Sequence, residues 1–466
     1  MSLEDRLYPL LATYDRLPDE AKRTLGRAYR ALPVRVRSGA RFDEFRRLAN
    51  GAYQESAEAC REYQLRELRR VLVHAQAHCP FYAQAFAEAG FRPAAVDDLD
   101  GLALCPTLSK RQLADNLAGL TATSVGPKER LYMTTGGSTG VPVGFYLQKG
   151  VSRPKEKAFL ESQWMRGGYF DGARLAVLRG YQTSRRSDGR IATYDATRDW
   201  LMLSSYHLSM ERLGEYLDAV GRFKPDLLHA YPSAALQLAD LLERAGRRWP
   251  VPLKGLLAGS EQLTLPQKRL LEATFGCPVY RWYGHAERVI LAGEGSDSEL
   301  FYFHPFYGFV EFGPPDGQGL CEVIGTSFHN LALPLIRYRT GDFVRPAKPV
   351  QYPWPAVSEI AGREHEFLVS RTGRRISLTA FNMHTEVFDD LYALQFAQDQ
   401  PGVVELRYVA SARFPPARLR VVEQAVHDKL GEDFDITLRR VEATERTAGG
   451  KHRWLVSQVP DDPPPP

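Results

Sequence analysis

The chain has 466 residues, long enough for a large core and for two or three domains. Hydrophobic residues make up 44% and charged residues 25%, which is ordinary for a soluble globular protein. Lys and Arg total 60 against 56 Asp and Glu, a net charge of +4, and this balance argues against nucleic acid as a partner.

The cysteines and the apolar segments indicate in which cellular compartment the protein is found. None of the five cysteines forms a Cys-x-x-Cys pair, so the spacing indicates neither a disulfide framework nor a zinc knuckle. A sparse, odd count fits a reducing cytosol. The first residues lack the apolar stretch of a signal peptide, and no segment approaches the length of a membrane span. We therefore expect a cytoplasmic protein without membrane insertion. The cysteines are Cys60, Cys79, Cys105, Cys277 and Cys321.

The first part of the chain predicts helices. Residues 1–75 are rich in arginine, and their apolar residues near position 70 recur at helical spacing. Pro80 is expected to stop that helix, because proline cannot continue it. A short helix is expected over residues 83–90, and another over 108–115 with Ser109 as its cap.

A glycine-rich loop follows between two apolar runs. The segment Leu131-Tyr-Met-Thr-Thr-Gly-Gly-Ser-Thr-Gly-Val-Pro-Val-Gly-Phe145 predicts a strand–loop–strand hairpin. Backbone N–H groups freed by glycine, together with hydroxyls, can hold a polyphosphate. The motif is not a Walker loop, because Val141 follows the last glycine instead of Lys. The alternative is an ordinary polar turn. The loop residues are Thr134, Thr135, Gly136, Gly137, Ser138, Thr139 and Gly140.

Helices and strands then alternate, which indicates a parallel sheet covered by helices. Strands are expected over 226–230, 253–258 and 279–282, and helices over 210–223, 233–245 (capped by Ser233) and 266–275. Residues 300–344 are β-rich. The last hundred or so residues predict a small α+β unit with a helix over 418–430, followed by a disordered tail at 461–466.

Three further segments stand in a fixed order after the glycine loop. They are Tyr283-Gly-His-Ala-Glu287, Leu335-Ile-Arg-Tyr-Arg-Thr-Gly-Asp342 and Thr447-Ala-Gly-Gly-Lys-His-Arg453. With the loop they resemble the adenylate-forming ligase superfamily. The segments Cys79-Pro-Phe-Tyr-Ala-Gln-Ala-Phe-Ala-Glu-Ala-Gly90 and Leu104-Cys-Pro-Thr-Leu-Ser-Lys110 are similar to the phenylacetate–CoA ligase family, including its capsule-biosynthesis-like branch, as are Phe223-Lys-Pro-Asp226 and Tyr231-Pro-Ser233. The resemblance covers roughly residues 70–456.

The resemblance implies an α/β fold in two working parts. A large N-terminal domain over residues 76–362 would combine helix-covered mixed and parallel sheets with a β-rich subdomain. A small, mobile α+β lid would follow over 363–460, with Glu366 as the expected hinge. Residues 1–75 would be a helical extension and 461–466 a disordered tail.

The same resemblance implies an ATP-dependent enzyme that joins a carboxylic acid to AMP and releases pyrophosphate. The acyl group would then pass to coenzyme A. Transfer to an amine or to a carrier protein stays open, and so does a homodimer. An inactive nucleotide-binding scaffold is the alternative from another class, and it predicts loss of the catalytic residues.

Roles for the motif residues also follow from the resemblance. The glycine loop would hold the β- and γ-phosphates of ATP, and Lys451 would stabilise charge at the α-phosphate. Glu287 would bind Mg²⁺, with an ion pair to Arg288 as the alternative. Nucleotide contacts would come from Tyr283, Gly284, Ser260, Glu261, Asp342 and Arg363. The structural alternatives are a core tyrosine at Tyr283, a helix-entry turn at Ser260 and Glu261, a β-turn aspartate at Asp342, a solvated charge at Arg363 and an exposed lysine at Lys451.

Residues expected to line the acid pocket are largely aromatic, and simple core packing is the equal alternative. They are Tyr181, Tyr206, His207, Tyr231, Trp282, His285 and Ala286. Arg179 and the run Ser184-Arg-Arg-Ser-Asp-Gly-Arg190 can meet an anionic group, although a solvated loop is the favoured interpretation. No zinc site is expected, because the segment after Glu287 lacks cysteine. His304 is then a structural or substrate-side histidine.

Overall fold

The computed structural model divides into two compact units. Unit 1 comprises Met1–Arg166, Ala196–Arg198 and Trp282–Ile360, and unit 2 comprises Gly167–Asp195, Asp199–Arg281 and Ala361–Pro466. The structure describes residues 7, 13–14, 17–134, 143–179, 190–205, 207–296, 298–363, 367–372, 375–377, 391–410, 414–430, 432–446 and 452–459. Each unit is described below by itself.

Helices dominate the first 165 residues of unit 1. α6 ends at His78 and α7 begins at Pro80, so the prediction that Pro80 stops the helix is confirmed. Ser109 caps α8 in a reciprocal capping box with Gln112, also as predicted. The helices are α3 (Asp19–Ala31), α4 (Val34–Ser38), α5 (Arg41–Gly51), α6 (Ala57–His78), α7 (Pro80–Glu88), α8 (Lys110–Asp115), α9 (Leu117–Leu120) and α10 (Ser152–Met165), with 3-10 turns at Ala52–Gln54, Pro93–Ala95, Asp100–Leu104 and Pro127–Glu129.

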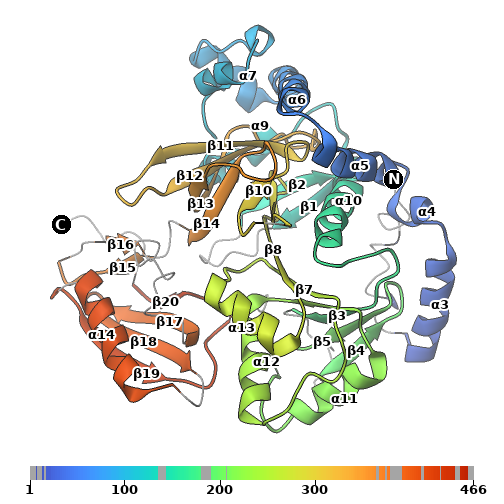
Figure 1. The fold of residues 1–466 in the computed structure, drawn as a ribbon. Coiled ribbons are helices and arrows are strands. Elements are labelled where there is room, and N and C mark those ends of the chain that lie inside the picture. The colour runs from blue at the N-terminus through green and yellow to red at the C-terminus, as the bar shows by residue number, and fades with distance from the viewer. Residues whose placement is uncertain are drawn as a thin grey trace. The chain divides into compact units, whose positions relative to one another are not determined.

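The strands of unit 1 form a hairpin and an antiparallel sheet. β1 (Arg130–Thr134) pairs with β2 (Gly144–Gln148), which confirms the strands on either side of the glycine loop. The sheet runs in the order β11-β12-β13-β14-β10-β9-β8, and Figure 1 shows its long strands in yellow and orange. Its members are β8 (Val279–Gly284), β9 (Leu291–Glu294), β10 (Phe301–Phe303), β11 (Gly308–Pro315), β12 (Cys321–Ser327), β13 (Tyr338–Ala347) and β14 (Ala356–Arg363). The first residues of β8, up to Arg281, and the last residues of β14, from Ala361, are counted with unit 2.

Unit 2 begins with the predicted strand–helix alternation. β6, β3 and β5 are mutually parallel, β7 joins parallel to β6, and β4 closes the edge antiparallel to β5. The helices α11, α12 and α13 accompany these strands (Figure 1). The elements are β3 (Leu175–Leu178), β4 (Ala192–Asp195), β5 (Trp200–Leu203), α11 (Leu213–Phe223), β6 (Leu227–Ala230), α12 (Pro232–Arg244), β7 (Gly255–Gly259) and α13 (Leu265–Phe275).

The C-terminal part of unit 2 is a four-stranded sheet in the order β19-β18-β17-β20, with α14 beside it (Figure 1). β17 and β18 are antiparallel, whereas β19 and β20 join in parallel. A separate hairpin joins β15 (Phe367–Val369) to β16 (Arg375–Ser377). The remaining elements are β17 (Leu391–Gln400), β18 (Val403–Ala410), α14 (Pro416–Leu430), β19 (Asp435–Arg440) and β20 (Leu455–Ser457). The α/β prediction is confirmed, while the domain limits and the lid's mobility stay predictions.

One helix cap differs from the prediction. α12 begins at Pro232, and Tyr231 is its N-cap residue, so Ser233 lies inside the first turn and does not cap it. The backbone N–H of Ser233 donates instead to Glu261, 2.9 Å away. A carboxylate from a distant loop therefore satisfies this free N–H group, as helix ends require.

The cores of the two units bury every cysteine. Cys60, Cys79, Cys105, Cys277 and Cys321 are all free thiols with buried side chains. Burial in apolar surroundings raises the pKa of Cys79, Cys105 and Cys277 to about 12. A neutral thiol is a poor nucleophile, so these cysteines are packing residues.

No helix in the described part of the chain has the length and apolar character needed to cross a membrane.

Candidate active site

The Tyr-Gly-His-Ala-Glu motif forms the end of β8 and the turn into β9. The backbone N–H of Arg288 donates to the carbonyl of His285, 3.0 Å away, and closes the turn. Arg288 has a φ of 57°, a left-handed conformation that costs energy for a residue with a side chain. A side chain at Gly284 would meet Leu291 at 3.2 Å. The motif is therefore a tight turn that holds its side chains at the end of the strand.

Two residues predicted to contact the nucleotide meet in unit 1. The Tyr283 hydroxyl, from β8, donates a hydrogen bond to Asp342 Oδ2 in β13, 2.8 Å away. Asp342 is buried, and its N–H donates to Thr340 Oγ1 at 3.0 Å. It follows Gly341, whose φ of 69° suits glycine. The fold thus joins two motifs that lie 59 residues apart.

Glu287 is buried and takes a different partner from its neighbour. Its Oε1 accepts a hydrogen bond from the Tyr338 hydroxyl at 2.9 Å. The Arg288 guanidinium instead approaches Glu156 of α10, with 3.8 Å between Nε and Oε2. The carboxylate of Glu287 is therefore oriented by a neutral hydroxyl. An oriented, negatively charged oxygen donor of this kind suits Mg²⁺.

Lys155 of α10 also supports the turn, and no sequence pattern indicates this contact. Its ammonium donates to the carbonyl of Arg288 at 3.3 Å and lies 3.5 Å from the ring centre of Tyr307. Burial lowers the pKa of Lys155 to about 7. A lysine within a polar helix predicts a solvated side chain, so only the tertiary structure reveals this contact.

The other candidates of unit 1 lie in β8, in the turn after it and at the end of β1. Trp282 is buried against Trp164, with 5.6 Å between ring centres. His285 packs edge-on against Tyr283 at 5.5 Å, whereas Ala286 is exposed. Thr134 ends β1 in an exposed position. The remaining loop residues, Thr135, Gly136, Gly137, Ser138, Thr139 and Gly140, lie outside the described residues.

In unit 2, Ser260 belongs to a polar cluster around Arg179. The guanidinium donates to Ser260 Oγ at 2.6 Å and to Nε2 of His229 at 2.8 Å, and it lies 4.5 Å from the ring centre of Tyr231. Because a guanidinium can only donate, His229 must accept through Nε2 and is neutral. Burial and the nearby Arg179 charge hold the pKa of His229 well below its usual range. Arg179 is thus packed and hydrogen-bonded, and the favoured interpretation of a solvated loop is wrong for this residue.

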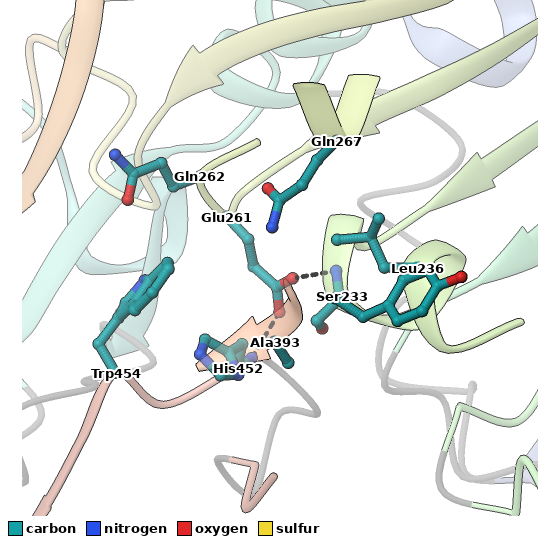
Figure 2. A pocket seen from close by; sticks show the side chains of 9 residues that line it. Ser233, Leu236, Glu261, Gln262, Gln267, Ala393, His452 and Trp454 are labelled. Atoms are coloured by element: carbon teal, nitrogen blue, oxygen red, sulfur yellow. Dashed lines mark hydrogen bonds between the residues drawn. The ribbon is translucent and has the colours of Figure 1, made fainter. Parts of the chain in front are cut away.

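Glu261 uses both carboxylate oxygens on backbone N–H groups. Oε2 accepts from Ser233 at 2.9 Å and Oε1 from His452 at 2.5 Å. These residues line a pocket of unit 2, and Figure 2 shows Glu261 between the two donors. The pocket is lined by Ser233, Leu236, Glu261, Gln262, Gln267, Tyr392, Ala393, His452 and Trp454.

Several predicted residues stay outside this geometry. His207 is exposed, with its Nδ1 2.7 Å from Ser204 Oγ. Arg363 ends β14, but its side chain is not described. Tyr181, Tyr206, Glu366 and Lys451 lie outside the described residues, as does the 461–466 tail. Their predicted roles stay predictions.

His304 has a structural environment. It is buried, its Nε2 lies 3.0 Å from the carbonyl of Ala49, and its ring packs against Phe159 and Trp354. Burial lowers its pKa to about 3. Among the residues that the structure describes, no three His, Cys, Asp or Glu side chains gather as a metal ion would require.

The fold and the order of these motifs are those of an adenylate-forming acyl-CoA ligase. The structure superposes on 2-hydroxyisobutyryl-CoA ligase, in a crystal structure of the postadenylation state with 2-HIB-AMP, with a TM-score of 0.63. The alignment covers 84% of this chain and 88% of that chain at 18% identity, so the likeness concerns the fold.

Sequence comparison identifies the family. A phenylacetate–coenzyme A ligase from Pseudomonas putida is 31% identical over 345 residues, which is 71% of this chain and 76% of that protein. The chain therefore belongs to the phenylacetate–coenzyme A ligase family, and the predicted family and its AMP-forming acid-ligase class are confirmed. The protein CapK of Staphylococcus aureus is 24% identical over 70% of this chain and 74% of its own length. Residues 368–458 match the CapK C-terminal domain.

Proposed function

We propose that the protein activates a small carboxylic acid with ATP and transfers the acyl group to coenzyme A. In the first step a carboxylate oxygen attacks the α-phosphorus, an O–P bond forms, and the bond to the departing pyrophosphate breaks. In the second step the thiol sulfur attacks the acyl carbon, a C–S bond forms, and AMP leaves while the thiol proton passes to solvent. Enzymes do this mainly by positioning and charge stabilisation.

The observation that carries the proposal is the pair of hydrogen bonds between the two motifs of unit 1. Tyr283 binds Asp342, and Tyr338 binds Glu287. We assign Asp342 to the ribose hydroxyls, because a charged acceptor suits hydroxyl donors. The ring of Tyr283 is assigned to adenine and its hydroxyl to the orientation of Asp342.

Glu287 is assigned to Mg²⁺, which supplies positive charge beside the phosphates. Its carboxylate is buried, and its described partner is the neutral hydroxyl of Tyr338, so a negative charge is available for a cation. Lys451, outside the described residues, is assigned to the α-phosphate. Arg363 and the glycine loop, including Ser138, complete the proposed nucleotide contacts.

The aromatic residues that are predicted to line the acid pocket favour a compact acid. Trp282 and His285 belong to unit 1, and Tyr231 to unit 2. Phenylacetate, which the Pseudomonas putida relative is named for, is the first acid to test.

The exchange of labelled pyrophosphate into ATP tests the first step. With Mg²⁺ and a panel of compact acids, we expect exchange that depends on at least one acid. Exchange with no acid in a broad panel would remove the adenylation proposal and favour an inactive scaffold. The presence of Glu287, Asp342 and Lys451 in the sequence argues against that scaffold.

The match of residues 368–458 to the CapK C-terminal domain supports a second candidate for the acceptor. In this alternative an amine, or a carrier protein, replaces coenzyme A. Product masses with coenzyme A and with a panel of amines separate the two: a thioester supports the main proposal, and an amide without thioester supports the alternative. Light scattering of the purified protein tests the predicted homodimer.

A further inference from the structure

The residues on either side of segment 447–451 are held together within unit 2. Arg446 and His452 face each other in an isolated antiparallel bridge. The Gln395 side-chain amide donates to the carbonyls of Glu445, at 3.1 Å, and Arg453, at 2.8 Å. The two described residues that flank this segment in the sequence, Arg446 and His452, are therefore fixed next to each other.

His452 is fixed through its backbone and its ring. Its N–H donates to Glu261 Oε1 at 2.5 Å. Nε2 lies 2.9 Å from the carbonyl of Leu394, and Nδ1 lies 3.0 Å from Thr444 Oγ1. Because a carbonyl only accepts, Nε2 carries the hydrogen and Nδ1 accepts from Thr444. Burial lowers the pKa of His452, in agreement with this neutral form.

Arg446 is held by the first two turns of α12. One terminal nitrogen donates to Ser233 Oγ and the other to Gln237 Oε1, each at 3.0 Å. The N–H of Ser233 in turn donates to Glu261. These five residues (Ser233, Gln237, Glu261, Arg446 and His452) form one connected group, here called the Glu261 clamp, and Figure 2 shows its centre.

The location of Glu261 gives the clamp its significance. Glu261 follows Ser260 directly after β7, in the loop that the family resemblance places beside adenine. The residue that follows Lys451 is thus tied to the loop proposed to border the nucleotide. The start of α12 also favours a negative charge at this point, because the helix dipole is positive there.

We propose that Glu261 and Arg446 are positioning residues for adenylation: they hold the bridge formed by Arg446 and His452 beside the loop proposed to border the nucleotide, and His452 is the residue that follows Lys451 in the sequence. This inference rests on the proposed function. It requires that loss of the clamp slows acyl-AMP formation and leaves the thioester step unchanged.

Glu261→Gln is the sharpest variant. Both Glu261 oxygens accept backbone N–H groups, whereas glutamine offers one oxygen and turns an NH₂ group toward the other donor. Hydrogen exchange of the protein alone should show the His452 amide exchanging at least about 10-fold faster, as loss of a hydrogen bond to a charged group predicts. Unchanged exchange would overturn the clamp without involving any substrate.

The half-reactions locate the effect. With the acid found in the pyrophosphate screen, Glu261→Gln should lower kcat for exchange by about 10- to 100-fold through misplacement, while KM for ATP stays within about twofold. Thioester formation from synthetic acyl-AMP should be unchanged. A rise in KM for ATP alone would show that Glu261 contacts the nucleotide. A slower thioester step with normal exchange would show that the clamp acts in the second step. Either result would overturn the proposal.

Arg446→Met provides an independent variant outside the nucleotide loop. It should reproduce the loss in kcat, and the double variant should lose little more than either single one, because both act through one group. Additive losses would contradict the clamp.

Glu405→Gln is the matched control, since Glu405 pairs with Arg407 and Arg439 within the C-terminal sheet. A wild-type protein that forms no acyl-AMP would defeat the proposed function, whereas a clamp failure leaves wild-type exchange intact.

Discussion

At the scale of single residues, tyrosine hydroxyls orient the acidic side chains of the proposed site. Tyr338 is almost fully buried, and its described bond to Glu287 joins the start of β13 to the turn after β8. A hydrogen bond to a charged group contributes more than one between neutral groups. The orientation of Glu287 is therefore the property most sensitive to this tyrosine.

Removal of the Tyr338 hydroxyl should weaken magnesium binding without emptying the core. We expect Tyr338→Phe to raise the Mg²⁺ concentration for half-maximal pyrophosphate exchange by about 10-fold. A magnesium titration of the exchange rate measures this shift. Tyr194→Phe is the matched control, because it removes a comparable 2.8 Å bond to Asp199 in unit 2. Equal magnesium dependence in all three proteins would contradict the role of Glu287.

Lys155 should give the protein a pH-dependent stability. Its pKa is about 7 in the fold against an ordinary 10.5, so the unfolded chain binds more protons between these values and stability rises with pH across that window. Lys155→Met removes this dependence. The stability gained by the variant should be about 2 kcal/mol larger at pH 7 than at pH 9.

Denaturant unfolding at the two pH values measures this difference. Lys157→Met, on the same helix but with a more exposed side chain, is the control. If the difference in free energy of unfolding between Lys155→Met and the wild type is the same at pH 7 and pH 9, the amine of Lys155 is not desolvated in the fold.

Some residues of the site can be predicted from sequence motifs, and others can be recognised only from the folded structure. Tyr283, Glu287 and Asp342 stand in motifs, and their proximity follows from the family fold. The sequence does not reveal the contacts of Lys155 or Arg179, because a cation in a sequence predicts a solvated side chain. Only the packing of α10 against the turn, and of β3 beside β6, places these cations among buried partners.

At the scale of elements, close packing fixes the parallel strands of unit 2. A side chain at Gly255, the first residue of β7, would lie 2.1 Å from the backbone carbonyl oxygen of Gly167. Backbone cannot yield as a flexible side chain can, so only glycine fits there. The loop with Ser260 and Glu261 follows the same strand, which links this packing to the proposed site.

A pair of glycine variants separates close packing from helix propensity. Gly255→Ala should lower the stability by about 1–3 kcal/mol through overpacking. Gly214→Ala, in α11 with nothing within 4 Å of the added methyl, should raise it by about 0.5–1 kcal/mol. Chemical denaturation measures both, and a Gly255→Ala protein as stable as the wild type would refute the contact.

Local sequence patterns predict the presence of helices and strands better than the residues at which these elements begin and end. Ser109 caps α8 because its partner Gln112 lies three residues away in sequence. Ser233 does not cap α12, because the N–H group concerned is satisfied by Glu261, 28 residues distant. α11 begins at Leu213, three residues after the predicted start, and ends at Phe223 as expected. Long-range partners thus decided what local patterns could not.

At the scale of the whole molecule, adenylation and thioester formation are proposed to depend on different residues of the same set of motifs. Lys451, in the Gly-Gly-Lys segment, is proposed to serve only the first. Lys451→Ala should slow pyrophosphate exchange by about 10²–10³, as the loss of one preorganised charge typically does. Thioester formation from synthetic acyl-AMP should remain close to normal.

Paired assays of the two half-reactions test this separation. The control is Lys348→Ala, a lysine between β13 and β14 of unit 1. Equal losses in both half-reactions would contradict a role confined to adenylation. Rotation of the C-terminal part between the steps is the corresponding proposal for the whole chain.

The family and the α/β class could be predicted from four separated motifs in a fixed order. The clamp around Glu261 could not, because its members come from α12, the loop after β7 and the isolated bridge between Arg446 and His452, and two of its bonds use backbone N–H groups. Backbone donors leave no trace in side-chain chemistry. Such contacts become visible only when distant segments are folded together.

The buried thiols have a practical consequence for studying this enzyme. Since all five native cysteines are shielded, a single engineered surface cysteine should accept a maleimide fluorophore selectively in the folded protein. Two such positions, one in each unit, would permit energy-transfer measurements during turnover with the native cysteines left in place. The same shielding keeps the protein's own sulfurs from competing with an incoming thiol for the activated acyl group.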